Sequence, residues 1–185
     1  MDIASVKIVR QKIPGLYLIE PYVHGDARGS FVKFFNESIF REHGIPDCEF
    51  RESFYTVSKR NVIRGMHFQI PPHSHCKLVC LIRGRALDVI LDLRKGSPSF
   101  GEFASFVFDR PIAVYVPEGC AHGFLSLEDE TNIMYCTGTV HNPSFDRGLR
   151  YDSFGFDWET ENPEISERDL ISPKFKDFES PFVFK

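Results

Sequence analysis

Residues 77–93 read KLVCLIRGRALDVILDL, and this stretch decides the fold. The run 77–84 is short and apolar and ends in a turn at Gly84. Residues 86–93 then alternate, with one face made of Leu87, Val89, Leu91 and Leu93 and the other of Asp88, Ile90 and Asp92. A period of two is typical of β-strands, so both runs are predicted to be strands.

Further strands are expected on the C-terminal side. The segments ASFVF (104–108), IAVYV (112–116) and NIMYC (132–136) are separated by Gly, Pro, Asp and Glu. Strands this short and closely spaced indicate an antiparallel sandwich or barrel. One helix is predicted over residues 36–44, capped by Asn36 and ended by Gly44. Short helical turns are expected in residues 166–178.

Composition limits the class of protein. A chain of 185 residues is expected to form one domain, 1–185, with a core large enough to need no metal or disulfide. The net charge is −4 and no basic run is present, which argues against a nucleic-acid partner. No apolar run has the length of a membrane span, and residues 1–15 lack an apolar signal core, so a cytoplasmic protein is expected. The five scattered cysteines are predicted to be reduced thiols: Cys48, Cys76, Cys80, Cys120 and Cys136.

Asp88 and Asp92 allow two interpretations. If their face of the strand lines a barrel interior, the lumen is polar and suits a ligand pocket. If it faces solvent, the carboxylates are ordinary surface charges. The alternation alone does not choose between these alternatives.

The segment RGMHFQIPPHSHCKLV (64–79) holds three of the seven histidines. His73-Ser-His75, together with PEGCAH at 117–122, resembles the metal motifs of the cupin family. However, no carboxylate follows His75 where a ligand is needed, and the Lys77 ammonium would oppose a divalent cation. The alternative is a Pro-rich turn with solvated histidines, and we predict that no metal is bound.

His67 is the stronger candidate for chemistry, although a lone histidine in a strand can also be a satisfied structural residue. Lys77 lies across the Pro-Pro turn, Arg64 precedes His67 by three residues, and His122 follows a Pro-Glu-Gly turn. An imidazole, an ammonium and a guanidinium in one region suit proton transfer on an anionic ligand. Taken singly, Arg28 in a turn, Tyr135 in a strand and Asp169 near a helix start are as well explained by structural roles.

Taken together, these segments resemble a known family. GDARGSF, NVIRGMHFQ, KLV, LDVILDLRKGSPSFG, VPEGCAHGFLSL and SERD occur in this order. The chain from about Ile19 to Asp169 is similar to the dTDP-4-dehydrorhamnose 3,5-epimerase family. That resemblance implies an all-β, antiparallel, cupin-like jelly-roll barrel with a few short peripheral helices, without metal or other cofactor and usually a homodimer. It also implies a role in deoxysugar biosynthesis, as for lipopolysaccharide or O-antigen.

The resemblance also implies roles for individual residues. The substrate would be a nucleoside-diphosphate 4-keto-6-deoxyhexose. His67 matches the general base and Asp169 its supporting acid, Tyr135 matches the general acid on the other face of the sugar, and Lys77 matches the residue beside the ketone oxygen. Substrate-binding positions are matched by Arg28, Arg64, Gln69 and His122, with Glu52 and Lys33 standing at further family positions.

These residue types suit the chemistry. Removing a proton next to a ketone needs a base of near-neutral pKa, such as an imidazole oriented by a carboxylate. The charge then moves to the ketone oxygen, where an ammonium stabilises it. Inversion requires a proton from the opposite face, which a phenol can give. Arginine forks suit a diphosphate.

The chain departs from the family pattern at positions around the base and sugar. Ser30 and Lys33 stand where an aromatic residue and a Glu are common, residues 52–54 replace Gln-Asp-Asn, and residues 140–141 replace a Tyr-Tyr pair. A carboxylate at residue 52 suits the exocyclic amine of cytosine. An epimerase acting at one position, or on a CDP-sugar, therefore remains an alternative. Further alternatives are a metal-dependent cupin enzyme and a non-catalytic sugar-binding barrel.

Overall fold

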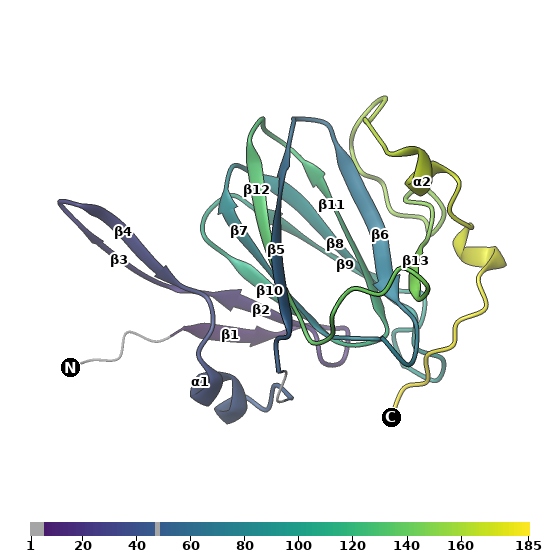
Figure 1. The fold of residues 1–185 in the computed structure, drawn as a ribbon, viewed down its shortest axis with the longest axis horizontal. Helices are drawn as coiled ribbons and strands as arrows, with labels where there is room; N and C mark the ends of the chain where they lie inside the picture. Colours follow the sequence, from purple (N-terminus) through teal and green to yellow (C-terminus); the bar gives the residue numbers. More distant parts are fainter. Residues whose placement is uncertain (1–5, 47–48) are drawn as a thin grey trace.

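The computed structural model describes residues 6–46 and 49–185 and consists mainly of two antiparallel sheets that face each other (Figure 1). The first sheet has the order β1 (Lys7–Arg10), β2 (Tyr17–Glu20), β10 (Ala113–Val116), β7 (Lys77–Arg83), β12 (Thr131–Thr137) and β5 (Glu52–Ser58). The second has the order β13 (Asp146–Gly148), β6 (Ile63–Gln69), β11 (Cys120–Ser126), β8 (Ala86–Asp92) and β9 (Phe103–Phe108).

The predicted all-β fold is confirmed. All five strands expected from the sequence are present, within a residue or two of their expected ends, and strands that follow one another along the chain often lie in opposite sheets. That arrangement is a jelly roll. In the described residues the two sheets share no hydrogen-bonded strand pair, so the architecture is a sandwich rather than a closed barrel.

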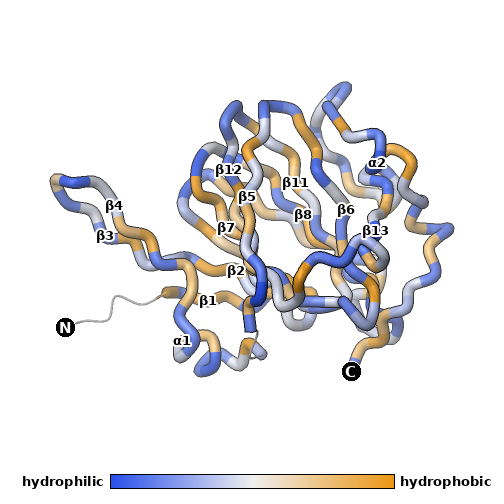
Figure 2. Tube along the Cα trace, in the orientation of Figure 1, coloured by the Kyte–Doolittle hydropathy of each residue, from blue (hydrophilic) through white to orange (hydrophobic). Residues whose placement is uncertain are grey.

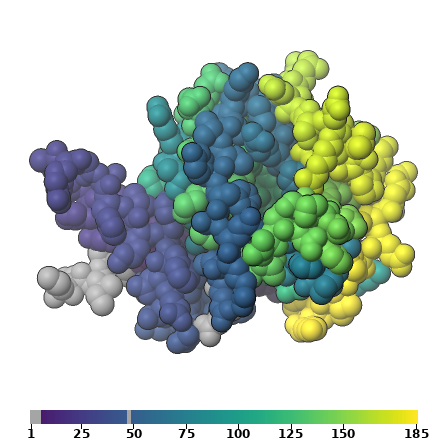
Figure 3. Space-filling model, in the orientation of Figure 1, coloured from purple at the N-terminus to yellow at the C-terminus, as the bar shows by residue number. Residues whose placement is uncertain are grey.

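Both faces of β8 are buried, each against a different layer. Ile90 packs into the core between the sheets, together with Val79, Phe124 and Ile133. The opposite face of β8, with Val89 and Leu91, is covered by the C-terminal segment, which forms the yellow layer in Figure 3. In Figure 2, hydrophobic and hydrophilic residues are accordingly interspersed along the strands. Because both faces of β8 are buried, apolar and polar residues alternate only partly along this strand.

The structure decides between the two interpretations of Asp88 and Asp92 in favour of the interior. Both residues are fully buried. Asp92 accepts hydrogen bonds from Arg94, Ser97 and Ser99 and so supports the turn between β8 and β9. Asp88 pairs instead with His122 of β11, the neighbouring strand in the sheet, and belongs to the site described below.

The predicted helices are also confirmed. Helix α1 spans Glu37–Glu42, and the side chain of Asn36 accepts a hydrogen bond from the backbone of Ile39. Gly44 ends this segment with φ +71°, a conformation that glycine adopts without strain. In the tail, α2 (Glu167–Leu170) and the 3-10 turn η1 (Phe175–Asp177) follow. No helix among the described residues is long and apolar enough to cross a membrane.

A hairpin of β3 (Tyr22–Asp26) and β4 (Gly29–Lys33) projects away from the sandwich, at the left of Figure 1. Its exposed side chains include the apolar Val23 and Phe31. Arg28 lies at its tip. Only the base of the hairpin is anchored, since Tyr22 packs against the core. Exposed apolar side chains on a projecting arm are typical of a segment that meets another molecule.

The expectation that all five cysteines are reduced is wrong for Cys76, which is disulfide-bonded. Spacing along the chain does not report the distance between thiols in space, which decides whether a disulfide can form. Cys80, Cys120 and Cys136 are free, as expected. The expectation for Cys48 lies outside the described residues.

Gly65 in β6 lies so close to β11 that a side chain cannot fit. A Cβ atom there would lie 2.5 Å from the Cα atom of Gly123, and φ is +136°. Gly65→Ala is therefore expected to lower the free energy of unfolding by about 2–3 kcal/mol, measured by urea denaturation, because the β6–β11 pair must separate. Gly29→Ala is the matched control, since φ there is +126° with nothing within 4 Å of the added Cβ. Equal losses for both variants would contradict the close-packing argument.

Candidate active site

A cavity of about 260 Å³ opens between the two sheets. It brings together most of the site residues predicted from the sequence: Glu52, Arg64, His67, Gln69, Lys77, His122 and Tyr135. They come from strands β5, β7 and β12 of the first sheet and β6 and β11 of the second. A molecule bound here is therefore contacted from two opposite walls.

His67 is held by Asp169 from a distant part of the chain. The Nε2 atom of His67 lies 2.7 Å from an Asp169 carboxylate oxygen, and the other carboxylate oxygen faces the backbone N–H of Gly65 at 3.4 Å. Burial alone would raise the pKa of Asp169, but the hydrogen bond and charge of His67, with the backbone of Gly65 and the Ser166 side chain, lower it. Asp169 is therefore an anion that fixes the orientation of the imidazole ring.

A second cavity of about 460 Å³ lies on the other side of His67. It is lined by Asp169 and shares Arg64, His67 and Arg168 with the first. The His67 side chain is 31% exposed. The imidazole thus has room to exchange a proton with solvent between reaction cycles.

Lys77 begins β7 and points its ammonium toward the strand that holds His67. Its Nζ donates a hydrogen bond of 2.9 Å to the backbone carbonyl of His67. Burial lowers the pKa of Lys77 to about 8, although the Asp146 and Asp88 charges oppose this change. The ammonium is therefore mainly protonated at pH 7, with two further protons available for an oxygen in the cavity.

Tyr135 stands on the opposite sheet from His67. Its side chain is almost fully buried, and its ring centroid lies 5.8 Å from that of His122 at 72°. Burial, together with the charge of Asp88, raises the pKa of Tyr135 well above its ordinary value. The phenol is accordingly protonated at any physiological pH, so that it can donate a proton and does not act as a resting base.

His122 and Arg64 complete the walls near His67. His122 is directly opposite His67 in the register of β11 and β6, and its Nε2 lies 2.6 Å from a carboxylate oxygen of the buried Asp88. The Arg64 guanidinium donates to the Ser58 hydroxyl at 3.0 Å. These contacts fix both side chains before any ligand arrives.

His73 and His75 lie beside the cavity, where they contact Gln69 and the residues around position 142. Gln69 Nε2 lies 3.1 Å from His75 Nδ1 and donates to the backbone carbonyl of His73, while Gln69 Oε1 accepts from the backbone N–H of Asn142 at 2.6 Å. The His73 ring packs on Phe145, 4.6 Å away. The interpretation of these histidines as freely solvated is therefore wrong, since both are partly buried and hold residues 139–145 in place.

The surroundings of His75 determine its protonation state. Burial, followed by the Lys77 charge, lowers the pKa of His75 to about 4, so the ring is neutral. Gln69 is 4% exposed, and its amide groups are already used by protein contacts.

No cluster of three or more His, Cys, Asp or Glu side chains within residues 6–46 and 49–185 is placed to hold a metal ion.

The departures at residues 52 and 141 form one connected unit. A carboxylate oxygen of Glu52 accepts from the backbone N–H of His141 at 2.6 Å, and His141 Nε2 lies 3.2 Å from Asp146. Asp146 in turn pairs with Arg168 at 2.7 Å. Several residues of the cavity wall were not predicted from the sequence: Thr56, Thr137, Asp146 and Arg168. Of these only Arg168 had a signal, because it lies inside the SERD motif, and His75 had been considered only as a metal ligand or a solvated residue.

Arg28 and Lys33 do not reach the cavity of their own chain. Both lie on the β3–β4 hairpin. The Arg28 side chain is 89% exposed and pairs with Asp26 at 2.5 Å, and Lys33 Nζ lies 5.8 Å from the ring of Phe31. Exposed pairs of this kind contribute little stability, so Arg28 is readily available to a ligand or another chain.

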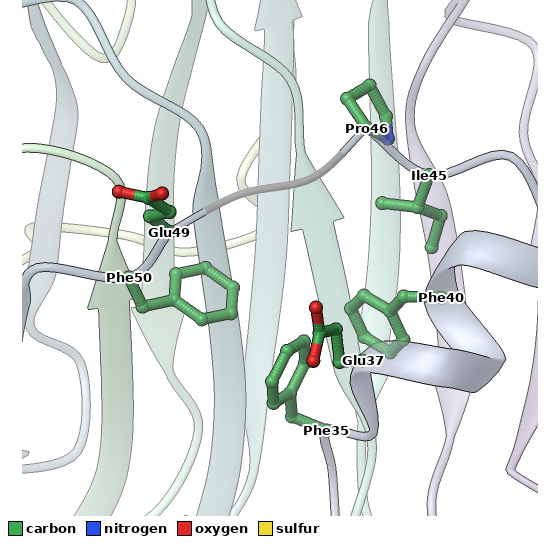
Figure 4. A pocket seen from close by; sticks show the side chains of 7 residues that line it. All are labelled: Phe35, Glu37, Phe40, Ile45, Pro46, Glu49 and Phe50. Atoms are coloured by element: carbon green, nitrogen blue, oxygen red, sulfur yellow. The ribbon is translucent and has the colours of Figure 1, made fainter.

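A further groove of about 320 Å³ lies beside α1 (Figure 4). The described residues that line it are Phe35, Glu37, Phe40, Ile45, Pro46, Glu49 and Phe50. Glu37 is paired with Arg41 and Glu49 with Arg51. This lining includes no histidine, lysine or tyrosine, so the acid–base groups are concentrated in the cavity between the sheets.

The fold and the site together define a cupin-like jelly roll with an acid–base pocket of the kind used by sugar epimerases. The sequence profile described as dTDP-4-dehydrorhamnose 3,5-epimerase matches residues 10–177. The chain belongs to the dTDP-4-dehydrorhamnose 3,5-epimerase family.

Individual relatives agree with this assignment. The dTDP-4-dehydrorhamnose 3,5-epimerase of Methanothermobacter thermautotrophicus is 38% identical and aligns over 90% of this chain and 92% of its own. The Legionella pneumophila epimerase solved with dTDP-4-keto-L-rhamnose superposes with a TM-score of 0.91 and 26% identity, over 98% of this chain and 100% of its own. A 3′-monoepimerase from Streptomyces bikiniensis, solved with dTDP-quinovose, gives a TM-score of 0.83 and 31% identity, over 89% and 85%.

Proposed function

We propose that this protein inverts C3, C5 or both in a dTDP-linked 4-keto-6-deoxyhexose by proton abstraction and reprotonation next to the ketone. The observation that supports this function best is the placement of a base and an acid on opposite walls. His67 comes from β6 of one sheet and Tyr135 from β12 of the other, and both line one cavity with Lys77. Inversion at carbon needs proton transfer on two faces, and this geometry supplies it.

The proposed steps balance in protons and electrons. His67 takes the proton from C3 or C5, and the electron pair of the C–H bond moves into the enolate, with the charge on the C4 oxygen. Lys77 stabilises that oxygen by its ammonium. Tyr135 then donates a proton to the same carbon from the opposite face. The imidazolium and tyrosinate return to their resting forms by exchanging protons with water, so no oxidation state changes.

Incubation of the wild-type enzyme with dTDP-4-keto-6-deoxyglucose in D₂O, followed by NMR, tests this function. We expect deuterium at each position that is inverted, and the pattern distinguishes action at C3, at C5 or at both. No deuterium incorporation would refute the epimerase function and favour a sugar-binding role.

We also expect kcat/KM to be at least about tenfold lower for the CDP-sugar, about 1.4 kcal/mol of discrimination, because the Glu52 carboxylate is already committed to the His141 backbone.

We further propose a homodimer in which the β3–β4 hairpin of one chain carries Arg28 to the cavity of the other. The support is that Arg28 lies on an exposed arm, away from its own cavity, with the apolar Val23 and Phe31 uncovered. An isologous dimer would cover both arms at once. Arg28 would then contact the diphosphate through its planar fork.

Mixing two inactive variants tests this arrangement. Arg28→Ala leaves its own cavity intact, whereas His67→Ala leaves its own hairpin intact. After unfolding and refolding the mixture, each heterodimer has one complete site, so about a quarter of the wild-type activity should return. The same variants refolded separately are the controls. Absence of recovery in heterodimers verified by mass would show that Arg28 does not act across the interface.

A further inference from the structure

Phe54 and Tyr135 form a stacked pair across neighbouring strands. They are direct partners in the register of β5 and β12, and their ring centroids are 4.9 Å apart with an angle of 16° between the planes. Both line the cavity between the sheets. Cross-strand aromatic pairs of this geometry are favourable beyond their buried area, so the two rings restrain each other.

Phe54 also closes the side of Tyr135 that faces the edge of the sheet. On the other flank Tyr135 is paired with the fully buried Val79 of β7, and the His122 ring meets it edge-on from the opposite sheet. Strand β5 is the last strand of its sheet among the described residues, and Phe54 is the residue of β5 directly opposite Tyr135, with Thr56 next along the same inward face. Phe54 is 45% exposed, whereas Tyr135 is 7% exposed. The phenylalanine therefore takes the solvent contact that the tyrosine would otherwise have.

Position 54 is one of the departures from the pattern of the family, which commonly has asparagine there. An asparagine side chain is shorter and cannot stack over the full phenol ring. In this chain an aromatic wall replaces a small amide beside the residue proposed as the proton donor. The change affects the neighbour of Tyr135 and leaves the acid–base residues themselves unaltered.

We propose that Phe54 is a positioning residue that fixes the Tyr135 ring and excludes water from it, so that the phenol proton is delivered to the sugar carbon. This proposal rests on the proposed epimerase function. It concerns the fate of the enolate after His67 has removed the proton. Prompt donation by Tyr135 gives the inverted product, whereas delayed donation lets His67, after exchange with solvent, return a deuteron to the original face.

The partition between these outcomes is the measurement. In D₂O, NMR gives the ratio of deuterium in recovered substrate of retained configuration to deuterium in inverted product. For Phe54→Asn and Phe54→Ala we expect this ratio to rise about tenfold, which is less than the rate loss produced by removing a general acid outright. Total deuterium incorporation should stay within about threefold of wild type. Phe54→Tyr keeps the stacked ring and should restore the wild-type ratio. Tyr55→Ser, on the outward face of the same strand and 67% exposed, is the matched control and should leave the ratio unchanged.

Each other outcome has a definite meaning. An unchanged ratio in folded Phe54→Asn and Phe54→Ala overturns the proposal, as does a rise in KM alone, which would make Phe54 only a substrate contact. Thermal denaturation verifies folding, and Phe54→Leu, which keeps apolar bulk without stacking, replaces any variant that fails to fold. Tyr135→Phe provides the reference for a lost donor. If wild type incorporates no deuterium, the epimerase function fails, and this result is distinct from a wild-type ratio in the Phe54 variants.

Discussion

His67→Ala is expected to abolish deuterium incorporation at every position of the sugar and, with it, product formation. The imidazole is bound to the buried Asp169 carboxylate and lines both the cavity between the sheets and the second cavity beside it. Loss of a general base typically reduces the rate about 10²–10⁴-fold. Because proton abstraction precedes both exchange and inversion, both signals should fall together, measured by NMR in D₂O and by single-turnover kinetics.

Two further variants make this result specific. Asp169→Asn keeps the shape of the carboxylate but removes its charge, so we expect a smaller loss than in His67→Ala. His43→Ala, at the end of α1 and remote from the cavity, should have the activity of wild type. Near-normal exchange in a folded His67→Ala protein would remove His67 from the mechanism and point to another base.

The limits of prediction from this sequence have a physical origin in the site. The strands that alternate or are uniformly apolar, such as residues 77–83 and 86–92, were predicted, and so was the capped helix at 37–42. Strand β5 was not predicted, and β6 and β11 were considered as strands only around His67 and His122, without bounds. They place polar side chains such as Glu52, His67 and His122 on inward positions of the sandwich. A binding cavity requires such residues, and they break the hydrophobic period from which strands are recognised.

The site shows the same division. His67 and Lys77 are ten residues apart, so a turn between them was visible in the sequence, and their hydrogen bond confirms the proximity. Asp169 lies 102 residues from His67 and was linked to it only by family resemblance. No local pattern reports a contact of that separation. The position of Arg28 on a projecting arm could not be anticipated either, because Asp-x-Arg-Gly describes a turn and not where the turn points.

Lys77→Met is expected to reduce kcat about 10²–10³-fold, the usual loss for one donor to a developing oxyanion. Methionine keeps the unbranched apolar chain and removes the ammonium. Since the enolate charge is then unsupported, deuterium exchange and inversion should decrease by the same factor. Tyr135→Phe should behave differently, with inversion falling more than exchange. An exchange rate in Lys77→Met close to that of wild type would contradict the assignment of the ammonium to the ketone oxygen.

The same ammonium predicts how activity depends on pH. Burial lowers the pKa of Lys77 to about 8 from an ordinary value of 10.5, so the wild-type kcat/KM should decline as pH rises through about 8. Between about pH 8 and 10.5 the unfolded chain holds this proton and the folded chain does not, so the contribution of Lys77 to the free energy of unfolding rises with pH across that window. Alkaline loss of activity would thus occur where deprotonation of Lys77 removes its cost to the folded state, and unfolding would not be its cause. Lys77→Arg, which stays charged, should have lower activity because its fork does not match the Lys77 geometry, but its alkaline decline should move above pH 9. A wild-type profile that stays flat to pH 10 while Lys77→Met is inactive would show that the ammonium keeps its proton despite its burial.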